Sequence, residues 1–144
     1  MSITKERRDH LICLADKALK EQKTILRDNK NILESYNGQV ASLSVSIAMT
    51  GLLPTLVIFY QDEPDGNTKK AYRRNVLDVV ARMITDDRQN EDWDFSENKN
   101  FADNLMKYSV NPQNKGKLND LKQEMEECAI ALKLVVRTYN LVKS

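Results

Sequence analysis

Residues 35–61 read SYNGQVASLSVSIAMTGLLPTLVIFYQ and contain no charged side chain, although 30% of the chain is charged. No other uncharged segment approaches this length, so we expect the fold to assemble around it. A membrane-spanning helix needs roughly 20 predominantly apolar residues. Because serines, threonines, a glycine and a proline interrupt the apolar residues here, we do not expect a membrane span.

One interpretation of this stretch is a pair of β-strands. Leu43, Val45 and Ile47 alternate with serines, as they would in a strand with one apolar face. Residues 56–60 read LVIFY and are rich in the side chains that strands favour.

The other interpretation is a pair of packed helices. Four side chains at spacings of four, three and four residues form one helical stripe: Tyr36, Val40, Leu43 and Ile47. Gly51 would end the first helix, because a helix C-terminus tolerates a left-handed glycine. Pro54 would lie in the first turn of the second helix, where its missing N–H costs nothing. The local pattern alone does not decide between strands and helices.

The same stretch resembles the signature of a known protein family. The matching residues are Tyr36, Val40, Leu43 and Ile47, followed by Thr50-Gly51-Leu52, Thr55-Leu56 and Phe59-Tyr60. The family is the small α-helical subunit, numbered fifth, of the Cmr (RAMP module) effector complex of type III-B CRISPR systems. Ser44 and Thr50 depart from the family pattern, which often has proline and asparagine at these positions. The resemblance covers residues 36–60 and, more loosely, residues 118–143.

This resemblance implies an all-α, single-domain helical bundle of about six helices, extending over residues 1–144. It also implies a non-catalytic structural subunit of an RNA-guided antiviral ribonucleoprotein. In such complexes, copies of the small subunit stack on one another beside the other Cmr or RAMP-type subunits. They help to hold the guide RNA and the target RNA, while other subunits carry out cleavage.

Length and composition agree with a single globular domain. The chain has 144 residues, 41% of them hydrophobic, and its four glycines and three prolines leave few points at which helices must end. The formal net charge is +1, so any basic surface must be local and balanced elsewhere. The N-terminal residues lack the apolar core of a signal peptide. We expect a cytoplasmic protein in which Cys13 and Cys128 are largely buried thiols.

A first helical pattern covers residues 4–33, with Thr4 as the expected N-cap, either as one helix or as two broken near residues 29–31. Four basic residues at spacings of three, four and three would line up along one helix edge: Lys20, Lys23, Arg27 and Lys30. One interpretation is a solvated face, paired with Asp16 and Glu34. The other, which the resemblance suggests, is a row of contacts to RNA phosphates.

A second amphipathic helix is predicted over residues 68–85, after an acidic loop. Four basic residues occupy its first turns: Lys69, Lys70, Arg73 and Arg74. Basic side chains at a helix N-terminus oppose the helix macrodipole, so helix stability does not explain them. Their partner would be either an external anion, such as an RNA phosphate, or the neighbouring Asp62, Glu63 and Asp65. The sequence leaves both interpretations open.

The C-terminal third is predicted to contain a connecting segment and two helices. Trp93 and Phe95 would anchor residues 86–100 to the core, and Ser96 would cap the short helix that follows. The last helix, over residues 118–143, has an apolar seam at alternating spacings of three and four: Leu118, Leu121, Met125, Cys128, Leu132, Val135, Tyr139 and Val142. Lys133 and Arg137 on this helix are weaker candidates for phosphate contacts.

The sequence offers few of the parts that common catalytic and metal sites need. His10 is the only histidine, so any nucleophile–histidine system rests on that imidazole, and a di-iron bundle lacks its second histidine. Two cysteines and one histidine do not complete a four-ligand zinc site, and no phosphate-binding glycine loop is present. We therefore expect no enzymatic activity, no metal and no cofactor.

Two functional hypotheses follow. The leading one is a structural subunit whose basic rows neutralise RNA phosphates without reading bases, so that the free protein binds RNA weakly and in a salt-sensitive way. The alternative is a helical protein-interaction module, an adaptor or inhibitor with no role for nucleic acid, whose apolar seams dock a partner helix.

Overall fold

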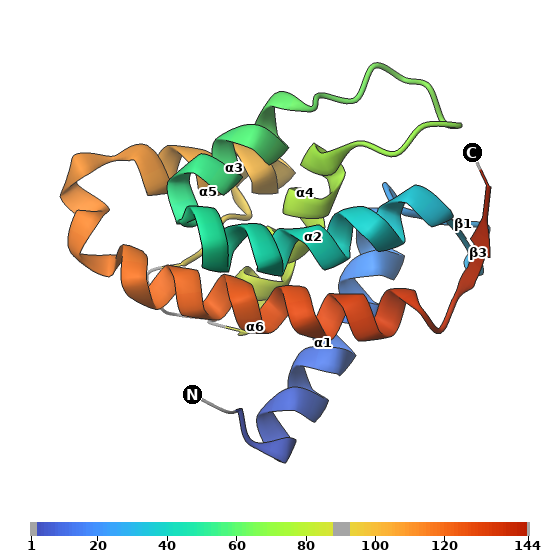
Figure 1. Ribbon diagram of the computed structural model, residues 1–144, viewed down its shortest axis with the longest axis horizontal. Coiled ribbons are helices and arrows are strands. Elements are labelled where there is room, and N and C mark those ends of the chain that lie inside the picture. The colour runs from blue at the N-terminus through green and yellow to red at the C-terminus, as the bar shows by residue number, and fades with distance from the viewer. Residues whose placement is uncertain (1–2, 88–92, 144) are drawn as a thin grey trace.

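The computed structural model describes residues 3–87 and 93–143 (Figure 1). Helices dominate this part of the chain, and the predicted all-α bundle of about six helices is confirmed. In chain order the elements are α1 (Lys5–Gln22), β1 (Leu26–Arg27), β2 (Asn31–Leu33), α2 (Glu34–Thr50), α3 (Leu52–Gln61), α4 (Arg73–Asp87), the 3₁₀ helix η1 (Glu97–Lys99), α5 (Phe101–Val110), the 3₁₀ helix η2 (Pro112–Lys117), α6 (Leu118–Val136) and β3 (Asn140–Val142).

The uncharged stretch forms the helices α2 and α3, which meet at Gly51. The helical interpretation is therefore correct, and the strand interpretation is wrong. The predicted stripe is buried in α2: Tyr36, Val40, Leu43 and Ile47. The hydroxyls of Ser46 and Thr55 lie 2.8 Å apart in a hydrogen bond that links the two helices. Within the described residues, no helix has the length and apolar character that crossing a bilayer requires.

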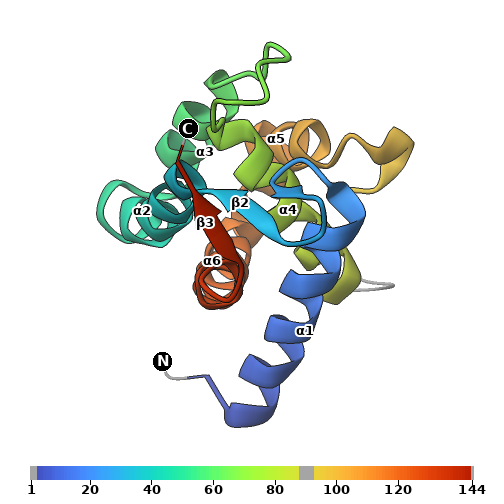
Figure 2. The ribbon, with the colours of Figure 1, turned by 90° about the vertical axis from the view of Figure 1, so that its right-hand side faces the viewer.

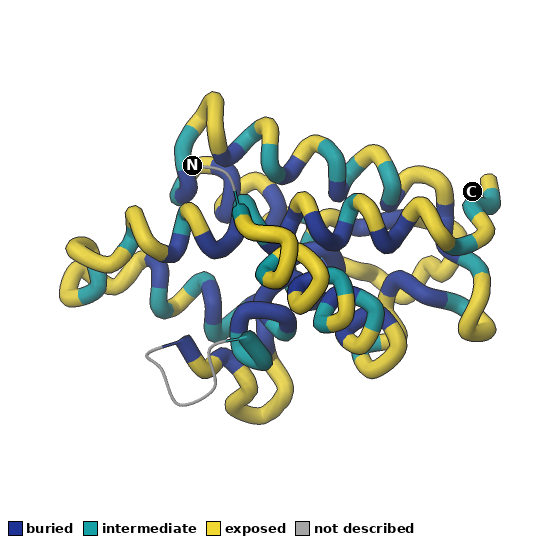
Figure 3. Tube along the Cα trace, turned by 90° about the horizontal axis from the view of Figure 1, so that it is seen from below, coloured by how far each residue is buried: buried dark blue, intermediate teal, exposed yellow. Residues whose placement is uncertain are grey.

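The core lies between α6 and the helices around it. α6 runs along both α1 and α2, while α4 packs against α1, α3 and α5 (Figure 1). Viewed from below, the buried residues follow the inner sides of the helices and the exposed ones their outer sides (Figure 3). Most of the predicted seam of the last helix is buried: Leu121, Met125, Cys128, Leu132 and Val135.

The first helix is shorter than predicted. Thr4 caps α1 as expected, since its Oγ1 accepts a hydrogen bond of 3.1 Å from the Arg7 backbone N–H. However, α1 ends at Gln22, and the chain then forms a β1–β2 hairpin in place of the predicted helix. The hairpin turn places Asp28 and Asn29 at φ 53° and 58°, a left-handed conformation that these two residue types tolerate better than most.

The last helix is also shorter than predicted, because α6 ends at Val136. Beyond it, β3 pairs in parallel with β2, and the resulting three-stranded sheet lies across one end of the bundle (Figure 2). The Tyr139 hydroxyl donates a hydrogen bond to Asp16 of α1. Burial and this hydrogen bond raise the pKa of Tyr139 to about 12. The C-terminal residues are therefore tied to two elements from the start of the chain.

Trp93 and Phe95 are buried and anchor the segment before α5, as predicted. The Trp93 indole N–H donates to the Tyr108 hydroxyl at 3.1 Å, and the Phe95 ring lies edge-on to the Tyr108 ring with centroids 5.8 Å apart. The prediction that Ser96 caps the following helix is wrong. α5 starts after Asn100, and the Ser96 hydroxyl hydrogen-bonds to Asp94 at 2.5 Å. Residues 88–92, part of the predicted connecting segment, lie outside the described residues.

A largely buried group of charges ties α1 to α4 and α6. Arg7 pairs with Asp87 at 2.9 Å, Glu124 at 2.8 Å and Glu127 at 3.1 Å. The hydrogen bond to Asp87 is the main reason that the pKa of Arg7 is raised above its ordinary value. Cys128 is buried beside Glu124, and this burial raises the pKa of its thiol. Cys13, which was predicted to be largely buried, is exposed because it lies beside the buried stripe of α1 and not on it.

Gly51 has a backbone conformation that substitution can test. Its φ of 103° and ψ of 166° lie in a region that essentially only glycine adopts. A Cβ atom at this position would lie 3.8 Å from Pro54 Cδ, an ordinary contact, so a side chain is disfavoured by the backbone conformation and not by crowding. We expect Gly51→Ala to lower the free energy of unfolding by about 1–3 kcal/mol, measured by urea titration.

Gly38→Ala is the matched control for this prediction. Gly38 lies on the exposed side of α2, and apart from its chain neighbours and the backbone of its own helix, no atom of the described residues lies within 4 Å of the Cβ that alanine would add. Because glycine within a helix is destabilising relative to alanine, this change should raise the free energy of unfolding by roughly 0.5–1 kcal/mol. Equal effects of the two substitutions would contradict the assignment of strain to Gly51.

Candidate nucleic-acid interface

A surface hollow of about 690 Å³ lies where two segments, far apart in the sequence, come together. One wall is formed by residues 23–29, which leave α1 and enter the β1–β2 hairpin. The other is formed by residues 64–75, which lead into α4, and Tyr36 of α2 lies between the two walls. Both segments are at the end of the bundle that carries the sheet (Figure 1).

The hairpin wall owes its shape to residues in left-handed conformations. Lys23 ends α1 at φ 56°, and its backbone N–H donates to the Leu19 carbonyl at 3.3 Å, which turns the chain away from the helix axis. Asp28 and Asn29 then reverse the chain between the strands. These turns expose Lys23 on one side of the hollow and place the half-buried Arg27 on its wall.

The opposite wall is held by side chains that bond to nearby backbone groups. Asp65 accepts hydrogen bonds from the Asn67 backbone N–H at 3.0 Å and from the Tyr72 hydroxyl. The Asn67 side chain in turn accepts one from the Lys69 backbone N–H at 2.9 Å. The hydrogen bond from Tyr72 holds the pKa of Asp65 below its ordinary value, so this carboxylate is ionised at neutral pH.

Tyr36 connects this wall to the core. Its hydroxyl oxygen accepts hydrogen bonds from the Tyr72 backbone N–H at 3.2 Å and from the Asn75 side-chain amide at 2.8 Å. Only 2% of Tyr36 and 8% of Asn75 is exposed, so both residues are largely buried at the base of the wall. The position of the wall relative to α2 is therefore set by a buried polar contact.

Positive charge predominates among the residues that line the hollow. Lys23, Arg27 and Lys70 are its cations, and Asp28 is its only lining carboxylate in the described chain. The Lys70 ammonium lies 5.4 Å from the centre of the Tyr72 ring, in the range of a cation–π contact. The hollow can therefore hold an anionic group such as a phosphate.

The first predicted basic row does not exist as one helix edge. Lys20 remains on α1, where it forms an ion pair of 2.8 Å with Asp16. Lys23, Arg27 and Lys30 follow the end of α1, in the hairpin segment. The prediction of a single row is wrong because the helix stops at Gln22, but two of its members, Lys23 and Arg27, meet in the hollow.

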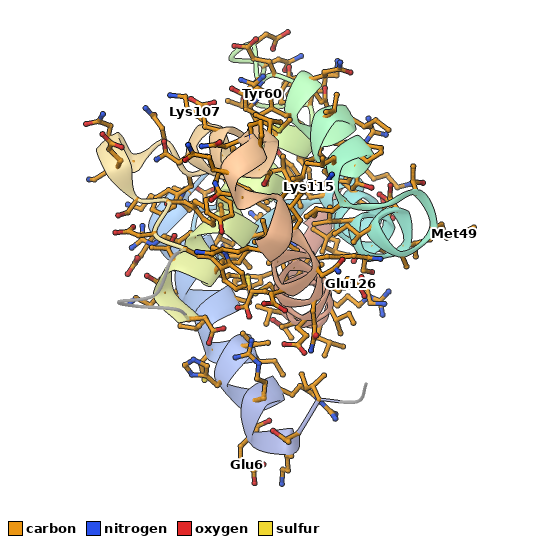
Figure 4. All side chains as sticks on the ribbon, turned by 90° about the vertical axis from the view of Figure 1, so that its left-hand side faces the viewer. Glu6, Met49, Tyr60, Lys107, Lys115 and Glu126 are labelled. Carbon is orange, nitrogen blue, oxygen red and sulfur yellow. The ribbon has the colours of Figure 1, made fainter. Side chains whose placement is uncertain are left out.

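The second row divides into arginines with internal partners and exposed lysines. The helix begins at Arg73, not at residue 68. The Arg73 backbone N–H donates to the Asp62 carboxylate at 2.7 Å. Arg74 donates to the Tyr60 carbonyl at 2.6 Å and lies 3.8 Å from the centre of the Tyr60 ring (labelled in Figure 4). The lysines of this row, Lys69 and Lys70, are exposed, and Lys70 lines the hollow.

The two weaker candidates lie elsewhere, at the end of α6. Lys133 is half-buried in the last turn, and Arg137 is the exposed residue that follows the helix. Basic side chains at a helix C-terminus are stabilised by the helix macrodipole, which accounts for both locally. Neither lines the hollow.

Sequence reasoning missed two residues of the site. Tyr36 was predicted as part of the apolar stripe and of the family signature but not as a hydrogen-bonding residue, and Asn75 was not predicted at all. A possible signal was the tyrosine itself, because the hydroxyl of a buried tyrosine usually requires a hydrogen-bond partner. Nothing in the local pattern around Asn75 indicates that its amide supplies one.

Comparisons with known protein families, with curated proteins and with solved structures found no match for this chain.

The different environments of the basic residues give a testable contrast. Arg74→Gln removes a charged hydrogen bond and a ring contact, so we expect it to lower the free energy of unfolding by about 1.5–3 kcal/mol in a urea titration. Lys69→Gln alters an exposed side chain and should change the free energy of unfolding by no more than about 0.5 kcal/mol. Equal losses from the two substitutions would refute the structural role of Arg74.

Proposed function

We propose that this protein is a non-catalytic structural subunit of a type III-B CRISPR effector ribonucleoprotein, in which it contacts RNA. Its partners are other Cmr or RAMP-type subunits, further copies of itself, and the backbone of the guide and target RNAs. The observation that carries the proposal is the hollow, in which Lys23 and Arg27 of one basic segment meet Lys70 of the other. The resemblance of residues 36–60 supplies the type of complex.

The chemistry of the hollow supports an anionic, extended ligand. Lysine and arginine side chains neutralise RNA phosphates, and such contacts fix the position of a strand without reading its sequence. The three lining cations stand against the lining carboxylate of Asp28 and against Asp65, which hydrogen-bonds to the lining residues Asn67 and Tyr72. Exposed Lys30 and Lys69 lie in the same two segments, so a strand that crosses the hollow meets further positive charge on both sides.

A second candidate function is supported by exposed apolar side chains. Val45 and Met49 of α2 are 56% and 82% exposed, and Ile130 and Leu134 of α6 are exposed on the helix that packs beside it. Met49 projects outward from α2 (Figure 4). An adaptor or inhibitor would use such residues to dock the apolar face of a partner helix, with no RNA involved.

Co-purification separates these two functions. Under the first, the tagged protein isolated from its native cell should bring down a short guide RNA together with several RAMP-type subunits. Under the second, it should bring down protein without a defined short RNA. Sequencing of the bound RNA and mass spectrometry of the bound proteins provide the measurement, and protein partners alone would overturn the RNA-guided assignment.

The contribution of the hollow can be measured with the isolated chain and a single-stranded RNA oligonucleotide. The double variant Arg27→Gln/Lys70→Gln removes two of the three lining cations. Each phosphate contact contributes about 0.7 to the slope of log K against log salt for a single strand. We therefore expect this variant to bind more weakly and to lower the magnitude of the slope by about 1.4, measured by fluorescence anisotropy at several salt concentrations.

The matched control is the double variant Lys107→Gln/Lys115→Gln. These exposed lysines lie on α5 and η2, away from the sheet end of the bundle (Figures 1 and 4). The control removes the same net charge, so a general loss of electrostatic attraction would affect both variants equally. If the two double variants give the same slope, the hollow is not where the RNA backbone binds.

A further inference from the structure

The hollow contains more than positive charge, because two of its most buried polar side chains have unused hydrogen-bonding capacity. The Tyr36 hydroxyl accepts from the Tyr72 N–H and from the Asn75 amide, but its own proton has no acceptor among the described residues. The Asn75 side-chain oxygen likewise receives no hydrogen bond from them. Both residues line the hollow, and both are more than nine-tenths buried.

Because both residues line the hollow, the Tyr36 hydroxyl proton and the Asn75 side-chain oxygen can form hydrogen bonds with a molecule bound there. Here one donor, the Tyr36 hydroxyl, lies within hydrogen-bonding distance of the Asn75 side chain that carries the acceptor. A ligand that offers a neighbouring acceptor and donor would satisfy both. Nucleobases present such adjacent groups on their edges, whereas a phosphate or a simple carboxylate offers acceptors alone.

The cations of the hollow supply the phosphate contacts that a bound nucleotide would need. Lys23, Arg27 and Lys70 come from the two walls and suit the anionic phosphate. The volume of about 690 Å³ lies within the range of roughly 300–1,000 Å³ that is typical of small-molecule sites. We infer that the hollow binds a single ribonucleotide unit, with its base edge against Tyr36 and Asn75 and its phosphate against the lining cations.

Two sources could supply this unit: a free nucleotide, or one nucleotide of a single-stranded RNA whose base is turned away from its neighbours. Recognition of unstacked bases in single strands is a general mode of RNA binding. The second source rests on the proposed function and extends it, because the hollow would then hold the strand by a base as well as by phosphates. Binding of a free nucleotide does not depend on the proposed function.

Comparison of uridine and adenosine monophosphates with ribose 5-phosphate tests the inference on the unmodified protein. All three ligands carry a ribose phosphate, but only the nucleotides carry a base. We expect both nucleotides to bind at least tenfold more tightly than ribose 5-phosphate by isothermal titration calorimetry. Equal affinities for nucleotide and ribose 5-phosphate, or no detectable binding of either nucleotide, would overturn the inference.

Two variants separate the base contact from the phosphate contact. Tyr36→Phe removes the donor and should reduce the tenfold preference to less than threefold. Because the Tyr36 oxygen also positions the wall that carries Lys70, the preference is taken relative to the ribose 5-phosphate affinity of the same variant. Arg27→Gln should instead weaken the binding of nucleotides and of ribose 5-phosphate by the same factor, so the preference for nucleotides should be unchanged. Thermal unfolding checks that each variant is folded; if Tyr36→Phe is not, the ligand comparison on the unmodified chain remains decisive. A preference that survives intact in a folded Tyr36→Phe protein would refute the base contact.

A parallel titration with single-stranded RNA distinguishes failure of this inference from failure of the proposed function. RNA binding that is weakened by Arg27→Gln/Lys70→Gln, without a preference for nucleotides over ribose 5-phosphate, would refute the nucleotide pocket and leave the RNA-binding role intact. Nucleotide binding without RNA binding would refute the proposed RNA role and keep the pocket as a site for free nucleotides.

Discussion

The hydroxyl oxygen of Tyr36 fixes the position of α2 relative to the surface that we propose as an RNA contact. Two donors from the start of the α4 region converge on it, the Tyr72 backbone N–H and the Asn75 side chain. A buried N–H without an acceptor would cost about 1–3 kcal/mol, so the segment that leads into α4 has one favoured position against α2. These hydrogen bonds to Tyr36 therefore also set the position of Lys70 on the wall of the hollow. The candidate interface thus depends on a core residue of the uncharged stretch.

The opposite wall is held in a similarly indirect way. Among the residues that the structure describes, β1 pairs only with β2, and β2 is paired on its other edge with β3. A two-stranded hairpin is marginally stable by itself in water, so the third strand and the buried Ile32 and Leu33 are what hold this wall in place. The hydrogen bond from Tyr139, which directly precedes β3, to Asp16 also links this part of the chain to α1. Arg27 is therefore positioned by residues from both ends of the chain.

These long-range contacts explain which features could be predicted from sequence. The helical periods of α2, α4 and α6 are local, and the sequence predicts them with errors mainly at their ends. The pairing of Ile32 with Leu141 has no local signal, so residues 23–33 and 140–142 were assigned to helices that their apolar spacing also allowed. The basic residues were found from their charge and spacing, but which of them share a surface depends on how the segments fold together. Arg74 illustrates the limit, because its partner is the carbonyl oxygen of Tyr60, a group that every residue carries.

The division of the basic residues also bears on how RNA would be bound. With a net charge of +1, the protein exerts little long-range attraction on a polyanion, and at physiological salt the screening length is only about 8 Å. Attraction must therefore come from cations close to the strand. Arg7, Arg74 and Arg82 are already engaged with carboxylates or ring faces inside the fold. Lys23 and Lys70 are exposed at the hollow instead, where Arg27 joins them on the wall. Under the proposed function, a nearly neutral protein with such a local site would bind RNA weakly by itself and would bind more strongly when other subunits hold the same strand beside it.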